Sequence, residues 1–159
     1  MSLVAQRVAF PSARRRFASQ LDHEGLEGRK GHEGLSAELE ALGRVVIDAG
    51  LKVHRTLGPG LLESAYEHCL AHELGLRGVT TRRQVVLPIV YEGLTLDAGY
   101  RLDLVVGDQL VVEIKAVDAL SRVHGAQVLT YLKLSRHRLG FLMNFDVELF
   151  KNGLRRFVI

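Results

Sequence analysis

Apolar residues recur every three or four positions between residues 37 and 56, a spacing that places them on one face of an α-helix. The segment Gly58-Pro59-Gly60 interrupts the pattern, and a second helical series follows it until Gly75 and Gly78. Proline is favoured in the first turn of a helix, and glycine just beyond its end. The pattern therefore predicts two consecutive helices joined by a short connection.

Three runs rich in β-branched residues follow, at residues 84–91, 100–106 and 110–117. The pairs Glu92-Gly93 and Gly107-Asp108, which favour turns, separate them. These runs predict three consecutive antiparallel strands.

A helix is predicted next over residues 119–135, and an apolar strand over residues 139–144. Asn152-Gly153 is typical of a two-residue hairpin turn, so we expect a final hairpin that closes with residues 157–159. The resulting order, ααβββαβββ, predicts an α/β (α+β) fold in which helices pack on a mixed sheet.

The second and third predicted strands form a hairpin with apolar residues at positions 102, 104 and 106 of one strand and 110, 112 and 114 of the other. Residues that face each other across an antiparallel pair lie on the same face of the sheet. A three-residue loop over residues 107–109 keeps the even positions together on one buried face. The same register places Asp103 opposite Glu113, with Lys115 one step along the strand.

This cluster of charges has two interpretations that the spacing leaves open. One is an exposed, salt-bridged outer face of the sheet. However, acids directly opposite each other repel unless a cation lies between them. Two converging carboxylates suit a hard ion such as Mg²⁺, and they leave Lys115 free to act on a water or a phosphate oxygen.

Asp103, followed by Glu113-Ile114-Lys115 and preceded by a helix and a strand, resembles the PD-(D/E)XK nuclease superfamily, whose core order is αβββαβ. The segment Gly60-Leu-Leu-Glu63-Ser-Ala-Tyr66 is similar to the signature of its GxxExxY branch. The resemblance spans roughly residues 39–159. It implies a restriction-endonuclease-like core, with a mixed central sheet flanked by helices, and a nuclease activity.

The resemblance also implies roles for individual residues. Asp103, Glu113 and the carbonyl of Ile114 would bind Mg²⁺ or Mn²⁺, and Lys115 would orient or activate the attacking water. Glu63 either completes this metal site or serves as a capping or surface residue of its helix.

Gln127 and Tyr131, four residues apart on one helix, resemble the Gln-x-x-x-Tyr element that lies beside the catalytic lysine in RecB-like nucleases. For Tyr131, ordinary half-buried packing is the alternative. Contacts with phosphate are expected from nearby charged residues, which are equally compatible with plain solvation. These candidates are Arg101, His124, Lys133 and Arg136.

The composition is that of one globular domain: 159 residues, 47% hydrophobic and 25% charged, with a single cysteine. A chain of this length buries roughly two thirds of its unfolded surface, so it needs no disulfide or structural metal. A single cysteine fits a reducing compartment, and no apolar run approaches the ~20 residues of a membrane span. We therefore expect a cytoplasmic protein without a membrane segment.

The net charge of +3 is unevenly distributed. Residues 1–20 contain four arginines and no acidic residue, so the rest of the chain is close to neutral and creates no global field that favours nucleic acid. We expect residues 1–35 to form a flexible, basic and glycine-rich extension, followed by a single domain over residues 36–159. Organelle targeting by the arginine-rich start is an alternative.

The sequence thus predicts a Mg²⁺-dependent nuclease that acts on DNA through two carboxylates and a lysine. One alternative is a catalytically silent module with the same fold that binds nucleic acid or a protein partner. Another is a homodimer formed by edge pairing of the C-terminal strand, residues 155–159.

Overall fold

The computed structural model describes residues 34–159. The predicted extension over residues 1–35, with its arginines, lies almost entirely outside the described residues. The helices are α1 (Ala37–Leu57), α2 (Glu63–Leu76), α3 (Arg122–Ser135) and α4 (Phe150–Gly153). The strands are β1 (Thr81–Tyr91), β2 (Leu94–Val106), β3 (Leu110–Lys115), β4 (Leu139–Asn144) and β5 (Leu154–Val158).

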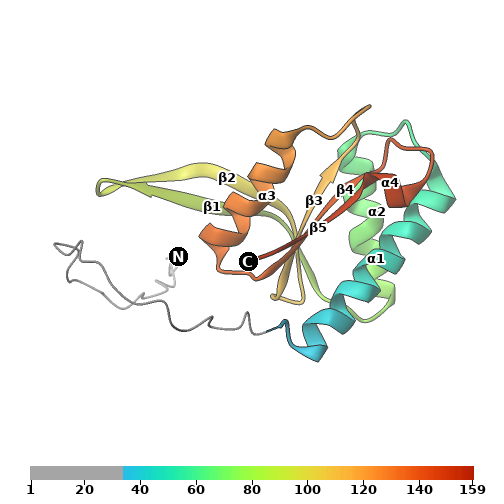
Figure 1. Ribbon diagram of the computed structural model, residues 1–159, viewed down its shortest axis with the longest axis horizontal. Helices are drawn as coiled ribbons and strands as arrows, with labels where there is room; N and C mark the ends of the chain where they lie inside the picture. The colour runs from blue at the N-terminus through green and yellow to red at the C-terminus, as the bar shows by residue number, and fades with distance from the viewer. Residues whose placement is uncertain (1–33) are drawn as a thin grey trace, which may run out of the picture. The chain divides into compact units, whose positions relative to one another are not determined.

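The strands form one five-stranded mixed sheet in the order β1-β2-β3-β4-β5 (Figure 1). β3 and β4 are parallel, and the other neighbours are antiparallel. Parallel strands need a crossover connection, which α3 provides. The order from α2 to β4 is αβββαβ, so the predicted mixed α+β fold with a restriction-endonuclease-like core is confirmed.

Helices cover both faces of the sheet. On one face, α1 and α2 pack on a core that includes Leu104, Val112 and Phe141. On the other face, α3 packs on a smaller cluster that includes Val111 and Leu142. The central strands are therefore buried on both sides, as is usual for strands that helices cover from both faces.

The three-residue loop after β2 is confirmed, because Val106 pairs with Leu110. The expectation that the apolar even positions share one buried face is confirmed for Leu104, Val106, Leu110, Val112 and Ile114, and two details differ from it. Glu113, at an odd position, is only 2% exposed because α3 covers that face. Leu102 packs in the α3 cluster, whereas Leu104 packs under α1 and α2, so β2 changes face between them.

β1 and β2 extend beyond the rest of the sheet as a two-stranded arm (Figure 1). Its turn is Glu92-Gly93, where both residues have positive φ (47° and 84°), as a type I′ turn requires. The register shifts between Leu87 and Ile89, and Pro88, which has no amide proton to donate, lies at this irregularity.

The predicted hairpin at Asn152-Gly153 is wrong, because these residues belong to the short helix α4, and the described part of the chain forms five strands instead of six. Tertiary packing overrides the local turn signal at this point. Phe150 is buried against Phe145, and Gly153 lies so close to β4 that an added Cβ would be 2.1 Å from the carbonyl oxygen of Asn144. The chain therefore returns to the sheet through a helical turn.

Candidate active site

Asp103 lies where β2 separates from β3. The β2–β3 ladder ends at the pair Leu104 and Val112. Just beyond it, Oδ2 of Asp103 accepts a hydrogen bond of 2.9 Å from the backbone amide of Ile114. The carboxylate thus replaces a strand partner for β3, and this bond holds it in place.

Glu113 lies on β3 with its side chain buried beneath α3. Its Oε1 accepts a hydrogen bond of 2.6 Å from Nζ of Lys115. Its Oε2 is buried and has no hydrogen-bond partner among the described residues. A buried carboxylate oxygen without a partner is costly, so it calls for a proton or a cation.

The two carboxylates are close enough for their charges to interact. Burial, and then the negative charge of Asp103, raises the pKa of Glu113 to about 7. The pKa of Asp103 is also raised, chiefly by burial. A hydrogen bond between the two acid groups acts in the same sense, raising the pKa of Glu113 and lowering that of Asp103, so the pair either shares a proton or binds a divalent cation in its place.

Lys115 ends β3 and is partly buried. Burial acts to lower the pKa of Lys115, but the hydrogen bond and charge of Glu113 outweigh it, so the pKa is raised. The charges of Glu63 and Asp103 act in the same direction. Lys115 is therefore a cation at neutral pH and a donor to anionic oxygens.

Glu63 opens α2 on the same side of the molecule. It is exposed, and its Oε1 accepts a hydrogen bond of 3.2 Å from the backbone amide of Ala116. Tyr66 fixes the start of this helix, because its hydroxyl donates to the carbonyl of Gly58 at 2.6 Å. The buried Tyr66 ring also stacks on Phe145, with ring centres 4.5 Å apart.

Tyr131 on α3 completes the surroundings of Glu113. Its ring is 2% exposed and meets Tyr100 edge to face, while the Gln127 side-chain amide donates to its hydroxyl. Burial, and then the charge of Glu113, raises the pKa of Tyr131 to about 12. Its hydroxyl therefore keeps its proton at neutral pH and can donate a hydrogen bond.

The candidates for phosphate contact do not form one cluster, because three lie along α3 and the fourth lies on β2. His124 lies in its first turn, where Nδ1 accepts a bond from the amide of Ser121. Lys133 lies in its last turn, and Arg136 is its C-cap with φ 61°. Arg101 is exposed on β2, opposite Val86 at the base of the arm.

Two residues that sequence reasoning did not propose also approach Asp103. Gln84 on β1 donates from Nε2 to Asp103 Oδ1 at 3.3 Å and to Glu67 Oε2 at 2.6 Å. Glu67 on α2 is 5% exposed. Its position on the apolar face of α2, beside Tyr66 and Leu70, was the available signal, since an acid on a buried face needs partners.

The two neighbouring carboxyl groups provide oxygen donors, which fit a hard cation. Among residues 34–159, no group of three or more histidine, cysteine, aspartate or glutamate side chains is placed to hold a metal. Asp103 and Glu113 are thus the carboxylate pair, and oxygen ligands beyond them would come from the backbone or from water. The unpartnered Oε2 of Glu113 is the observation that makes the fit specific.

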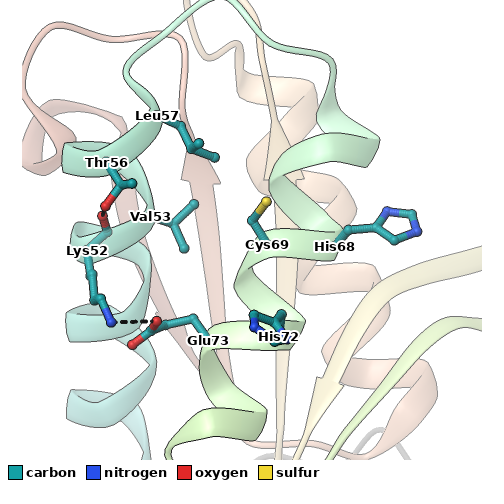
Figure 2. A pocket seen from close by; sticks show the side chains of 8 residues that line it. All are labelled: Lys52, Val53, Thr56, Leu57, His68, Cys69, His72 and Glu73. Atoms are coloured by element: carbon teal, nitrogen blue, oxygen red, sulfur yellow. Dashed lines mark hydrogen bonds and ion pairs between the residues drawn. The ribbon is translucent and has the colours of Figure 1, made fainter.

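A cavity of about 490 Å³ lies between α1 and α2, and none of the acidic-site residues lines it. In Figure 2 the sulfur of Cys69 points into it, whereas His68 points away. Lys52 and Glu73 form an ion pair of 2.9 Å at its edge. The cavity is therefore separate from the acidic site.

Comparison with known proteins identifies one family. The model of the PD-(D/E)XK nuclease superfamily matches residues 40–157. No curated protein and no solved structure matches the chain. Within residues 34–159, no helix has both the length and the apolar character needed to cross a bilayer.

Proposed function

Because the chain belongs to the PD-(D/E)XK nuclease superfamily, we propose that it is a DNA nuclease that depends on Mg²⁺ or Mn²⁺ and works through Asp103, Glu113 and Lys115. We further assign it to the GxxExxY branch, on the residues Gly60, Glu63 and Tyr66. The observation that carries the proposal is the buried, unpartnered Oε2 of Glu113 beside Asp103. A site held ready for a cation accounts for it.

Asp103 and Glu113 would hold the cation, with the carbonyl of Ile114 as a backbone ligand. The cation would supply Lewis-acid chemistry at a phosphoryl oxygen. Glu63 supports this region through its bond to the amide of Ala116, next to Lys115. In this proposal its contribution to the metal is through water or through Lys115.

Lys115 would stabilise negative charge that develops on the phosphoryl oxygens during attack. Its raised pKa suits this role better than that of a general base, which must be neutral. Gln127 would orient the hydroxyl of Tyr131, which would donate a hydrogen bond to the phosphate. Arg101, His124, Lys133 and Arg136 would contact the DNA backbone.

Cleavage assays test this proposal directly. Purified protein is incubated with linear, circular and single-stranded DNA in the presence of Mg²⁺, Mn²⁺ or EDTA. Lys115→Ala is the test variant, and Lys52→Ala, whose exposed side chain pairs with Glu73 on the other side of α2, is the matched control. We expect cleavage that needs metal, survives in Lys52→Ala and is lost in Lys115→Ala.

Absence of cleavage by the unmodified protein in every condition would contradict the proposal. DNA binding that is sensitive to salt and insensitive to metal would then favour a silent binding module.

A homodimer through β5 stays a prediction. β5 is an edge strand of the sheet. Val158 at its end is 46% exposed, and the next residue, Ile159, is 42% exposed. Light scattering that finds a monomer would contradict the prediction of a homodimer.

A further inference from the structure

The buried carboxylate of Glu67 is held by two neighbouring residues of β1. Its Oε1 accepts from Nε of Arg83 at 2.7 Å, and its Oε2 accepts from Nε2 of Gln84 at 2.6 Å. Each oxygen of the Glu67 carboxylate therefore accepts one short hydrogen bond. Oε1 accepts it from a charged guanidinium, and Oε2 accepts it from a neutral side-chain amide. A buried acid is stable only with such partners, so this arrangement is closely determined.

Two consecutive strand residues do not normally reach the same side chain, because successive side chains point to opposite faces of a sheet. Gln84 escapes this rule with a φ of 52°, in the left-handed region that residues with side chains rarely adopt. Strain of this kind persists only where the surroundings impose it, and it concentrates at functional sites. The strained backbone of Gln84 therefore indicates that its hydrogen bonds have a functional role.

The same amide nitrogen of Gln84 also lies 3.3 Å from Oδ1 of Asp103. Both neighbours of this nitrogen are carboxylate oxygens, which accept only, so the amide must present its two protons to them. Oδ2 of Asp103 is held by the amide of Ile114 at 2.9 Å. Both oxygens of Asp103 are thus fixed, one by β3 and one by β1.

The contact between Gln84 and Asp103 lies at the point where β2 separates from β3. Gln84 and Asp103 lie opposite each other, between the paired residues Arg83 with Leu104 and Val85 with Leu102. At this point β2 changes face and leaves β3, so the regular ladder cannot orient Asp103. Hydrogen bonds to its side chain must therefore orient Asp103.

We propose that Gln84 is a positioning residue for Asp103 and that buried Glu67 anchors Gln84 in this role. The inference rests on the proposed function, because the orientation of Asp103 matters for holding a cation. Gln84 touches neither metal nor substrate in this account. It fixes one oxygen of Asp103 while leaving that oxygen able to accept a second partner.

Two substitutions separate the hydrogen bonds of Gln84 from its backbone strain. Gln84→Met keeps the length of the side chain and removes both bonds. Gln84→Gly removes both bonds and also relieves the positive φ. Gln109→Met, in the exposed loop after β2, is the matched control. The measurement is Mn²⁺ titration calorimetry without DNA at pH 8, with thermal unfolding recorded for each variant.

We expect Gln84→Met and Gln84→Gly each to weaken Mn²⁺ binding about tenfold, the lower range for loss of a partner that orients a metal ligand. Gln84→Gly should be the more stable of the two, yet bind equally weakly. Cleavage by both should show a lower kcat with an unchanged KM for DNA. Gln109→Met should match the unmodified protein throughout.

Two results would overturn the inference while leaving the proposed function intact. One is Mn²⁺ affinity in both Gln84 variants equal to that of the unmodified protein. The other is affinity that follows the unfolding temperature, so that Gln84→Gly binds normally, since this would reveal a merely structural role. If the unmodified protein itself binds no Mn²⁺, the proposed function fails, and the inference fails with it.

Discussion

Strand β2 runs through both the centre of the sheet and the arm, yet its side chains are buried in the first region and exposed in the second. At the C-terminal end of β2, Leu104, Val105 and Val106 are at most 1% exposed. In the arm, Leu94 and Leu96 of the same strand are 57% and 46% exposed. Burial here depends on what packs against the strand and much less on its own residues.

Asp103 lies at the boundary between these two regions. On the central side, the neighbouring strand and α3 exclude water from Glu113. On the arm side, β1 is the only strand within residues 34–159 that β2 pairs with. A carboxylate at such a boundary can meet a buried partner and still be reached by a charged ligand, which explains why the site forms there.

The largest expected difference between the two regions is in stability. Phe141→Ala in β4 should lower the free energy of unfolding by about 3–5 kcal/mol, because it opens a cavity at a side chain that is 1% exposed. Val90→Ala in the arm should change it by no more than about 0.5 kcal/mol. Urea denaturation checks both values, and comparable losses in the two variants would show that the arm contributes to stability as much as the centre of the sheet does.

The rate of DNA cleavage should likewise depend on the centre of the sheet and not on the arm. Lys115→Met should reduce DNA cleavage about 10²–10³-fold, the usual effect of removing one donor that stabilises developing charge. Tyr91→Ala, at the tip of the arm, should leave the cleavage rate unchanged. Initial rates on one linear substrate test this, and a large loss with Tyr91→Ala would give the arm a part in substrate binding.

The pH dependence of stability should report the buried acid. The pKa of Glu113 is raised to about 7, so between its ordinary value and 7 the folded protein holds a proton that the unfolded chain has released. Without metal, stability should therefore fall by about 3 kcal/mol as pH rises from 4.5 to 7 and level off above it.

Glu113→Gln removes this titration and should flatten that part of the curve. Urea unfolding of both proteins in EDTA at pH 5 and pH 8 makes the comparison. Equal pH dependence in the two proteins would show that Glu113 ionises normally and that its burial is not costly.

The smallest expected effect concerns the hydroxyl of Tyr131. Tyr131→Phe keeps the buried ring and removes one hydrogen bond, worth about 1 kcal/mol, so cleavage should fall roughly fivefold. The unfolding temperature should change little. If instead stability falls and the cleavage rate per folded molecule is unchanged, Tyr131 has only a packing role.

Local patterns predicted much of this molecule, because the features concerned depend on local physics. The loop over residues 107–109 followed from the need to keep apolar residues on one face, and the pairing of Val106 with Leu110 confirms it. The same register predicted that Asp103 and Glu113 lie close together. The effect of Asp103 on the pKa of Glu113 agrees with this, although the ladder between β2 and β3 ends one pair before them.

The remaining features depend on contacts between distant segments. Asn152-Gly153 has the composition of a hairpin turn, but the packing of Phe150 against α1 and the end of β4 decides its conformation. Similarly, nothing in a strand pattern indicates that Gln84 would adopt a positive φ to reach Glu67. Sequence periodicity records faces and turns, and it does not record which helix covers which end of a strand.

The proposed catalysis depends on Asp103 and Glu113 forming a site for a divalent cation. The decisive experiment is calorimetric titration of Mn²⁺ into the unmodified protein and into Glu113→Gln, at pH 8 and without DNA. We expect saturable binding to the unmodified protein and its loss in the variant, which has the same shape and no charge. Equal affinity in the two proteins, or no binding by either, would show that these two acids do not form such a site.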